Sequence, residues 1–314
     1  HFDTMKVEQV GEDRVYVSDC RGSSPPSTHK VCVNTLGAYK QSIEVLLTGL
    51  DIEKKAEIYV DQIFHNLGGK EQFTDVDIHL IRSDKEDPAS NEEAHAALRI
   101  TITSDDPSKL GRLLQAKVTE LGLAAIPGNT GRGAAGYNGN AVIAYWPTLI
   151  DSRKVTERVH INGDLIEVLP TQRLGLEERY YQEVPVKIPP APSGDTTRIP
   201  FGRLFGTRSG DKGGAANCGV WAKTDEAFGF LHEFLTVEKF KELAPDMASY
   251  KIERFDLPNL RALNFYIHDV LGEGVSSNHR IDKQAKSLCE YLRAKTIEAP
   301  TLLVDQIART NLNE

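Results

Sequence analysis

The stretch that decides the fold reads QSIEVLLTGLDIEKKAEIYVDQIFHNLGG and covers residues 41–69. Ile43, Val45 and Leu47 place an apolar side chain at every second position, which is the period of a strand with one buried face. Over residues 52–67, apolar side chains recur with the period of an amphipathic helix. Asp51 can cap the start of this helix, and the glycine pair at 68–69 can end it. The stretch therefore predicts a strand that leads directly into a helix.

The pattern continues outward from this pair of elements. Alternating apolar residues predict strands over 76–80 and 98–102. A second helix is predicted over 106–121, and a last strand over 141–146. The order is then βαββαβ, which is the ferredoxin-like unit with both helices on one face of an antiparallel sheet.

Turn and proline signals divide the chain into domains. The ferredoxin-like unit lies within residues 1–170, and the proline-rich residues 171–198 predict a linker. Residues 199–298 form a second domain, and residues 299–314 form a tail that we expect to be peripheral. Two further hairpins are predicted over 7–17 and 160–168. In the first domain, a further short strand is predicted over 31–33.

The second domain shows the same two periodicities. Its predicted elements are strands over 199–205, 218–222, 250–255 and 262–267, and helices over 225–234, 236–244 and 281–292. Thr236 can cap the second of these helices, with Leu235 and Phe240 as its hydrophobic staple. A second α+β sandwich is therefore predicted.

Composition and charge limit the function classes. The 314 residues carry a net charge of −8, which argues against non-specific nucleic-acid binding because such binding needs a basic surface. No apolar run approaches the ~20 residues of a membrane span. The four cysteines lack C-x-x-C spacing, and the nine histidines lack metal-ligand spacing. We expect a cytoplasmic protein with reduced thiols, no metal site, and no nucleic-acid or membrane partner.

A loop with unusual chemistry joins the first two strands of the second domain. It reads GTRSGDKGGAAN and covers residues 206–217. Gly213 and Gly214 tolerate positive φ, so successive backbone N–H groups can turn inward and form a nest for an anion. Arg208 and Lys212 add a planar fork and a point charge suited to carboxylate or phosphate. The loop is predicted to bind an anionic group of a small substrate.

Three residues of this loop are candidates for catalysis. Ser209 and Lys212 match the S-x-x-K spelling of penicillin-recognising enzymes, but the following glycine pair disfavours the required helix by about 2 kcal/mol relative to alanine. Asp211 is expected to organise the neighbouring cations. A P-loop is not spelled, because Gly213 follows the lysine. The simplest alternative is a tight hairpin whose glycines serve only the turn.

Other polar residues can complete the site. Asn264 lies in an apolar strand, where a buried amide needs partners, so it either holds the loop by hydrogen bonds or reaches a substrate carbonyl. Arg132 and Tyr137 belong to a second glycine-rich connection at 127–139, which is long enough to suggest ligand contact. The predicted substrate-binding residues are Arg208, Ser209, Asp211, Lys212, Gly213, Gly214, Asn217, Asn264 and Arg132.

Four stretches of the sequence resemble one protein family. RSGDKGG at 208–214 and LPNLRALNF at 257–265 resemble the C-terminal domain of the AtuA-like family, which is named for acyclic terpene utilisation. LTGLD at 47–51 and DPASNEEA at 87–94 resemble the later part of that family's larger N-terminal domain. The resemblance implies a second ferredoxin-like unit. The expected fold is α+β, with two ferredoxin-like α/β sandwich domains and predominantly antiparallel sheets.

The resemblance also bears on completeness and function. Family members begin with a further long stretch, so we expect this chain, which opens at His1, to be a C-terminal piece of a longer protein. The resemblance implies an enzyme or enzyme component of acyclic terpenoid or branched acyl catabolism. A lyase or hydratase is favoured, with no separate cofactor and with CoA as a candidate part of the substrate.

Two alternatives from other classes stay open. One is a non-catalytic assembly or binding module, because ferredoxin-like units often pair through their sheets and a fold does not fix a function. The other is a hydrolase that uses Ser209 as its nucleophile. A homo-oligomer is expected in either the enzyme or the module reading.

Overall fold

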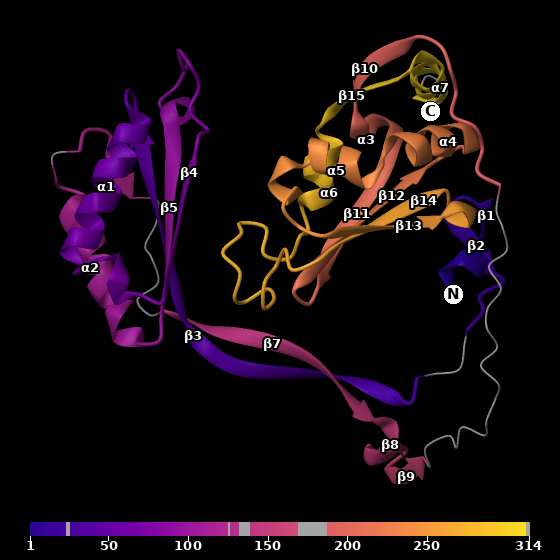
Figure 1. Ribbon diagram of the computed structural model, residues 1–314, viewed down its shortest axis with the longest axis horizontal. Coiled ribbons are helices and arrows are strands. Elements are labelled where there is room, and N and C mark those ends of the chain that lie inside the picture. Colours follow the sequence, from indigo (N-terminus) through magenta and orange to yellow (C-terminus); the bar gives the residue numbers. More distant parts are fainter. Residues whose placement is uncertain (23–25, 125, 132–138, 169–186, 312–314) are drawn as a thin grey trace. The chain divides into compact units, whose positions relative to one another are not determined.

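The computed structural model describes residues 1–22, 26–124, 126–131, 139–168 and 187–311. The chain divides into two compact units (Figure 1). The first unit comprises residues 34–144, and the second comprises residues 1–33 together with 145–314. Both combine helices with antiparallel strands, so the predicted α+β class is confirmed. Within the described residues, no helix is both long and apolar enough to cross a membrane.

The first unit has the predicted ferredoxin-like order. Its elements are strands β3 (Thr28–Thr48), β4 (Asp75–Ile81), β5 (His95–Ser104), β6 (Asn129–Gly131) and β7 (Asn140–Asp151), with helices α1 (Ile52–Asn66) and α2 (Arg112–Leu121). The sheet order is β4-β5-β3-β6, with β7 also paired to β3. The first strand thus lies between the third and the last, as in a ferredoxin-like sheet. Helices α1 and α2 lie side by side on one face of the sheet (Figure 1).

Alternation along the strands builds the core of this unit. Ile43, Val45 and Leu47 of β3 face the helices and are almost completely buried. They pack with Ile100 of β5 and Tyr59 of α1 in one apolar cluster. Each fully buried aliphatic side chain contributes about 1.5–3 kcal/mol relative to exposure, so this face holds the helices on the sheet.

Three details of the first unit differ from the sequence-based expectation. The strands predicted over 31–33 and 43–47 are one continuous strand, β3. Asp51 stands before α1 in a left-handed conformation with φ 56°, and its side chain makes no capping hydrogen bond. The second helix begins only at Arg112, because Gly111 takes a φ of 63° and interrupts the helical backbone.

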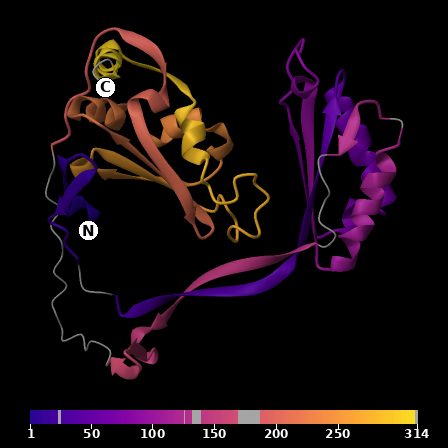
Figure 2. The same ribbon diagram turned by 180° about the vertical axis from the view of Figure 1, so that it is seen from behind.

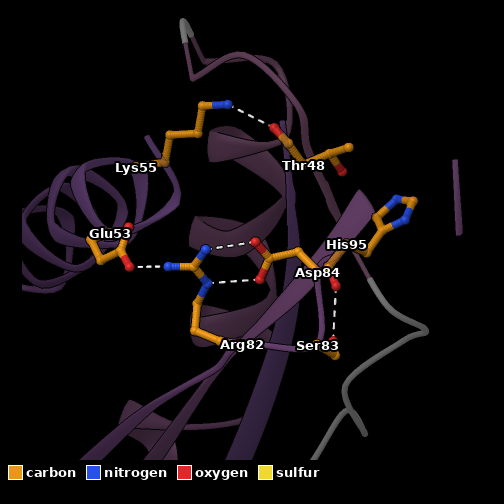
Figure 3. A network of polar contacts seen from close by, with 7 residues as sticks. All are labelled: Thr48, Glu53, Lys55, Arg82, Ser83, Asp84 and His95. Carbon is orange, nitrogen blue, oxygen red and sulfur yellow. Dashed lines mark hydrogen bonds and ion pairs between the residues drawn. The ribbon is translucent and has the colours of Figure 1, made fainter. Parts of the chain in front are cut away.

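A polar network anchors one end of the first unit's sheet (Figure 3). Arg82 follows β4 and donates from Nε and Nη2 to the two carboxylate oxygens of Asp84, at 2.7 and 2.6 Å. Its Nη1 pairs with Glu53 in the first turn of α1. The hydrogen bonds from Arg82 hold the pKa of Asp84 below its usual value.

Backbone carbonyls complete the network. Lys55 Nζ donates to the Thr48 carbonyl at 2.7 Å, and Ser83 Oγ donates to the His95 carbonyl at 2.8 Å (Figure 3). Thr48 and His95 face each other in the β3–β5 ladder. The stretches 47–51 and 87–94, singled out in the sequence, are therefore brought to the same end of this sheet.

The second unit is built around a four-stranded antiparallel sheet. The strands of the whole unit are β1 (Lys6–Gly11), β2 (Arg14–Ser18), β8 (Glu157–Ile161), β9 (Asp164–Val168), β10 (Thr196–Pro200), β11 (Phe205–Lys212), β12 (Ala215–Ala222), β13 (Ile252–Leu257), β14 (Ala262–Ile267) and β15 (Thr296–Pro300). Its helices are α3 (Phe201–Leu204), α4 (Asp225–Phe234), α5 (Val237–Leu243), α6 (Leu288–Arg293) and α7 (Thr301–Asn311). The central sheet has the order β11-β12-β14-β13 (Figures 1 and 2).

This sheet is a permuted form of the ferredoxin-like order. Strands β12, β13 and β14 take the places of the first, second and third strands, with α4 and α5 as the first crossover. The fourth place, beside β12, is filled by β11, which precedes β12 in the chain. After α6 the chain therefore does not return to the sheet. It continues as β15, which pairs with β10.

Helices α4, α5 and α6 cover one face of this sheet over an aromatic-rich core. Phe265 of β14 stacks on Phe240 of α5, with ring centroids 4.7 Å apart, and Phe228 of α4 is buried in the same cluster. The predicted Thr236 cap is confirmed, since its Oγ1 accepts a hydrogen bond from Lys239 N at 3.1 Å. Burial of these rings holds the three helices on this face of the sheet. The opposite face is not covered by these helices.

Two predicted elements near the C-terminus are wrong. Only the last part of the helix predicted over 281–292 forms, because Ala285 takes a left-handed φ of 52° and Asp282 accepts the following backbone amides. The tail from residue 299 is not peripheral. It forms the end of β15 and then α7, where Leu303 is buried in the core of the second unit.

Candidate functional site

The predicted binding loop is part of the central sheet of the second unit. Residues 206–212 belong to β11, residues 215–217 begin β12, and Gly213 with Gly214 forms the turn between them. The ladder runs without interruption from Phe205 opposite Ala222 to Lys212 opposite Ala215. The backbone is therefore that of the tight hairpin, the simplest alternative considered from the sequence.

Alternate residues of the four strands form the face that the helices leave uncovered, here called the open face. On the hairpin it carries Gly206, Arg208, Gly210, Lys212, Ala215, Asn217, Gly219 and Trp221. On the other two strands it carries Glu253, Phe255, Leu257, Ala262, Asn264 and Tyr266. The face combines two cations, two amides and three aromatic rings around a glycine-rich floor.

Glycines on the open face leave the backbone bare, so that aromatic rings can pack directly on it. A Cβ at Gly206 would lie 2.3 Å from Trp221 Cε2, so the indole packs directly on the backbone of β11. Gly219 lies between Arg208 and Asn264 in the ladder and offers no side chain. Trp221 and Phe255 remain 43% and 51% exposed. This surface can contact an apolar chain and a polar group at once.

The two predicted amide residues meet on the open face. Asn217 Nδ2 donates to Asn264 Oδ1 at 3.1 Å, from β12 to β14. This contact is diagonal, since Asn217 faces Tyr266 in the ladder and Asn264 faces Gly219. The bond uses one of the two N–H donors of Asn217 and none of those of Asn264. The amide pair therefore joins the strands and can still donate to a carbonyl oxygen.

The two predicted cations lie four residues apart on β11. Because a strand rises about 3.3 Å per residue, their Cα atoms are separated by about 13 Å and they do not converge on one carboxylate. Arg208 is exposed and makes no hydrogen bond or ion pair with any described residue. Lys212 Nζ donates to the Asp211 carbonyl at 2.9 Å. Arg208 is thus the group on this face that is ready to receive an anion.

Ser209 and Asp211 point to the other side of the strand. Ser209 is 5% exposed, and its Oγ accepts a hydrogen bond from Cys289 N at 3.0 Å, in the first turn of α6. Asp211 pairs with Lys286 Nζ at 3.6 Å. Lys286 precedes α6, so this ion pair joins the segment before α6 to β11.

Gly213 and Gly214 are packed against other parts of the second unit. Gly213 has a φ of 67°, and a Cβ there would lie 2.8 Å from Tyr145 Cε1. A Cβ at Gly214 would lie 2.1 Å from the Gly272 carbonyl oxygen, and Leu271 N donates to the Gly214 carbonyl at 2.8 Å. These glycines serve the turn and its close packing.

The sequence-based reasoning missed a histidine–carboxylate pair on the open face, which His268 extends by one residue beyond the end of β14. His268 Nε2 lies 2.8 Å from Glu253 Oε2, and its ring contacts Tyr266 edge-on with centroids 4.8 Å apart. Lys251 Nζ lies 2.9 Å from the other oxygen of Glu253. The hydrogen bonds from His268 and then Lys251 lower the pKa of Glu253. The signal was present, because residues 264, 266 and 268 alternate with a buried apolar set.

A second polar array was also missed, on the face of the first unit's sheet that α1 and α2 do not cover. It consists of three rows across β4, β5 and β3, namely Asp75–Thr103–Lys40, Asp77–Thr101–Ser42 and His79–Arg99–Glu44. A cleft of ≈ 630 Å³ next to it is lined by Ser42, Glu44, Tyr59 and Arg99, among others. Burial raises the pKa of Tyr59 to about 12.

Arg132 and Tyr137 lie outside the described residues. Among the residues that the structure describes, no group of three or more His, Cys, Asp or Glu side chains is placed to hold a metal ion.

Comparison with known families covers most of the chain. Residues 1–161 match the family model described as acyclic terpene utilisation family protein AtuA. Residues 199–298 match the model described as AtuA ferredoxin-like domain. No curated protein and no solved structure was found to match the chain.

Proposed function

The chain belongs to the acyclic terpene utilisation family AtuA, and from this premise we propose that it binds an acidic substrate of acyclic terpenoid or branched acyl catabolism on its open face. Family membership supports the class of pathway. The observation that supports the place is Arg208, an exposed guanidinium on a glycine-floored sheet face between an indole and an amide pair.

The surroundings of Arg208 suit a molecule with an acidic group and an apolar chain. A guanidinium binds carboxylate or phosphate through two parallel N–H donors, so a free acid or the phosphates of a CoA thioester both fit it. Lys212, about 13 Å along the strand, suits a second and separate anionic group. Trp221 and Phe255 offer exposed ring faces for a branched hydrocarbon chain.

The chemistry that we propose is a lyase or hydratase reaction next to a carbonyl group. The Asn217–Asn264 pair keeps amide N–H donors that can polarise a substrate carbonyl. Ser209 has a different role, because its hydroxyl accepts a backbone amide proton inside the unit, whereas a nucleophilic serine donates its proton to a base.

Replacing Arg208 by alanine is expected to weaken binding of an acyl-CoA or free branched acid by about 10- to 100-fold, since a hydrogen-bonded charge contact contributes about 1.5–3 kcal/mol. Calorimetric titration measures this directly. A thermal-shift screen against CoA thioesters, carboxylates and phosphate finds the ligand first, because 100 times the dissociation constant stabilises by about 2.7 kcal/mol.

The matched control is Arg203→Ala, which removes another exposed guanidinium from the same unit but outside the open face. Equal loss of binding in both variants would show a non-specific charge effect and contradict the site. Failure of every acidic ligand to bind the unmodified chain would contradict the proposed function itself.

A specific observation favours a second candidate, the assembly module. The hairpin β1–β2 exposes apolar side chains on both of its faces, since the consecutive residues Val15, Tyr16 and Val17 are all exposed. The hairpin β8–β9 likewise exposes Val159 and Ile166. Isolated two-stranded hairpins are marginally stable in water, and their free edges favour pairing with another strand. We propose that a second copy of this chain covers them.

Light scattering after size exclusion tests the assembly module. We expect a dimer or larger homo-oligomer whose mass falls toward the monomer at low concentration, and a shift toward monomer in Val15→Lys/Val17→Lys. The control Lys223→Ala changes an exposed residue that belongs to neither hairpin and should leave the mass unchanged. A monomer at all concentrations would rule out this assembly.

A further inference from the structure

We propose that His268 is the general base of the open face and removes a proton from the carbon next to the substrate carbonyl, with Glu253 positioning its ring. The inference rests on the proposed function and deepens it by assigning the proton-transfer step.

The contacts of His268 leave one ring nitrogen for chemistry. Nε2 lies 2.8 Å from the Glu253 carboxylate, which accepts only, so Nε2 carries the proton and Nδ1 carries the lone pair. Within the described part of the chain, Nδ1 has no hydrogen bond. The edge contact with Tyr266 packs against the ring and limits its rotation. The histidine is thus oriented as a base whose accepting nitrogen is unused.

Glu253 suits the positioning role. Lys251 Nζ lies 2.9 Å from Glu253 Oε1, on the side of the carboxylate away from His268. The low pKa of Glu253 keeps it charged at neutral pH. A fixed carboxylate stabilises the imidazolium that forms when the ring accepts a proton, as in carboxylate–histidine pairs of known enzymes.

The ladder places His268 in line with the predicted binding residues. Asn217 faces Gly210, which is two residues beyond Arg208 on β11, and also faces Tyr266, which is two residues before His268. The step from Arg208 to Asn217 and the step from Asn217 to His268 are therefore both diagonal. Diagonal neighbours in a sheet lie about 7–8 Å apart, within reach of long side chains.

One extended substrate can contact Arg208, the amide pair and His268 along this diagonal. The acidic group binds at Arg208, the carbonyl oxygen lies at the amide pair, and the adjacent carbon reaches His268. In the step, the C–H bond breaks, its proton moves to Nδ1 of His268, and its electron pair forms the enolate. The negative oxygen accepts hydrogen bonds from amide N–H groups of Asn217 and Asn264. Return of a proton from the imidazolium restores the substrate.

The other histidine–carboxylate pairs have different surroundings. Asp256 pairs with His232, but it also binds Arg254, which donates to the carbonyls of His232 and Leu235 at the end of α4. That cluster caps the C-terminal end of α4. His79 pairs with Asp77 within the first unit. Of the described pairs, only His268 with Glu253 lies on the open face.

Deuterium uptake from D2O tests the step without a full reaction cycle. The probe is 3-methylbutanoyl-CoA, a branched thioester with exchangeable protons next to its carbonyl, and mass spectrometry follows the label. The chain should accelerate exchange above buffer. His268→Gln and His268→Asn should each lower the exchange rate at least about 100-fold with unchanged thioester affinity, since general base catalysis contributes about 10²–10⁴-fold.

Two further variants separate positioning from folding. Glu253→Gln should reduce exchange, and Glu253→Asp should restore part of it by returning a carboxylate. His79→Gln is the matched control, because it removes a histidine from a carboxylate pair in the first unit. Circular dichroism confirms that each variant is folded.

The outcomes distinguish the two proposals. If 3-methylbutanoyl-CoA and the other acidic ligands do not bind, the proposed function fails and this inference fails with it. If the thioester binds at Arg208 but its protons do not exchange, or exchange equally fast in both His268 variants, only the assignment of the base is overturned.

Discussion

Replacing Phe265 by alanine is expected to lower the free energy of unfolding of the second unit by about 3–5 kcal/mol. The ring is fully buried on β14 and stacks on Phe240 of α5, so its loss removes apolar contacts and leaves a cavity between sheet and helix. Urea unfolding followed by tryptophan fluorescence measures the change, because Trp221 reports on the same sheet.

Phe255 is the matched control for this substitution. It lies on the neighbouring strand β13 but on the open face, where half of its surface is exposed. Phe255→Ala should therefore change stability by no more than about 0.5 kcal/mol. Equal losses in the two variants would contradict the assignment of the two faces of the sheet.

Replacing Gly214 by alanine is expected to destabilise the second unit by about 1–3 kcal/mol or more, because a Cβ there would clash with the backbone carbonyl of Gly272 at 2.1 Å. The neighbouring loop has little freedom to move, since Leu271 N is hydrogen-bonded to the Gly214 carbonyl. Thermal unfolding of the variant measures the loss.

Gly219→Ala provides the comparison within the same hairpin. Its Cβ would meet only the Arg208 carbonyl, at an ordinary contact distance of 3.6 Å, and its φ is not in the left-handed region. A small effect is expected. A stable Gly214→Ala variant with unchanged melting temperature would show that the turn and the 271–274 loop can move apart.

Much of the fold follows from local periodicity. The alternation at 43–47 and the helical spacing after Asp51 were enough to predict the last part of β3 and the whole of α1. The same reasoning failed over 206–212. Polar residues and glycines in that stretch suggest a loop, but the backbone is held as an edge strand by its ladder with β12, which is a tertiary interaction.

The candidate site was predicted only in part, because its residues were selected by residue type and not by the face of the strand on which they lie. Arg208, Asn217 and Asn264 were selected by residue type, and the structure places all three on one face. Ser209 and Asp211 were selected with them, although strand alternation turns these two toward the helices. His268 could not be linked to Glu253 from spacing alone, because the pairing of β13 with β14 sets that contact.

The permuted order of the second unit has a consequence for the sequence of events in folding. Strand β11 meets β12 through a two-residue turn, and β13 meets β14 through a short connection, so only the β12–β14 pairing must close a long loop. Closing short loops costs less entropy and is faster. All four strands lie within residues 205–267, before α6 and β15 in the chain. Pairing of the four strands therefore needs no residue after 267, and its one long closure, β12 to β14, corresponds to the closure of β3 with β5 in the first unit.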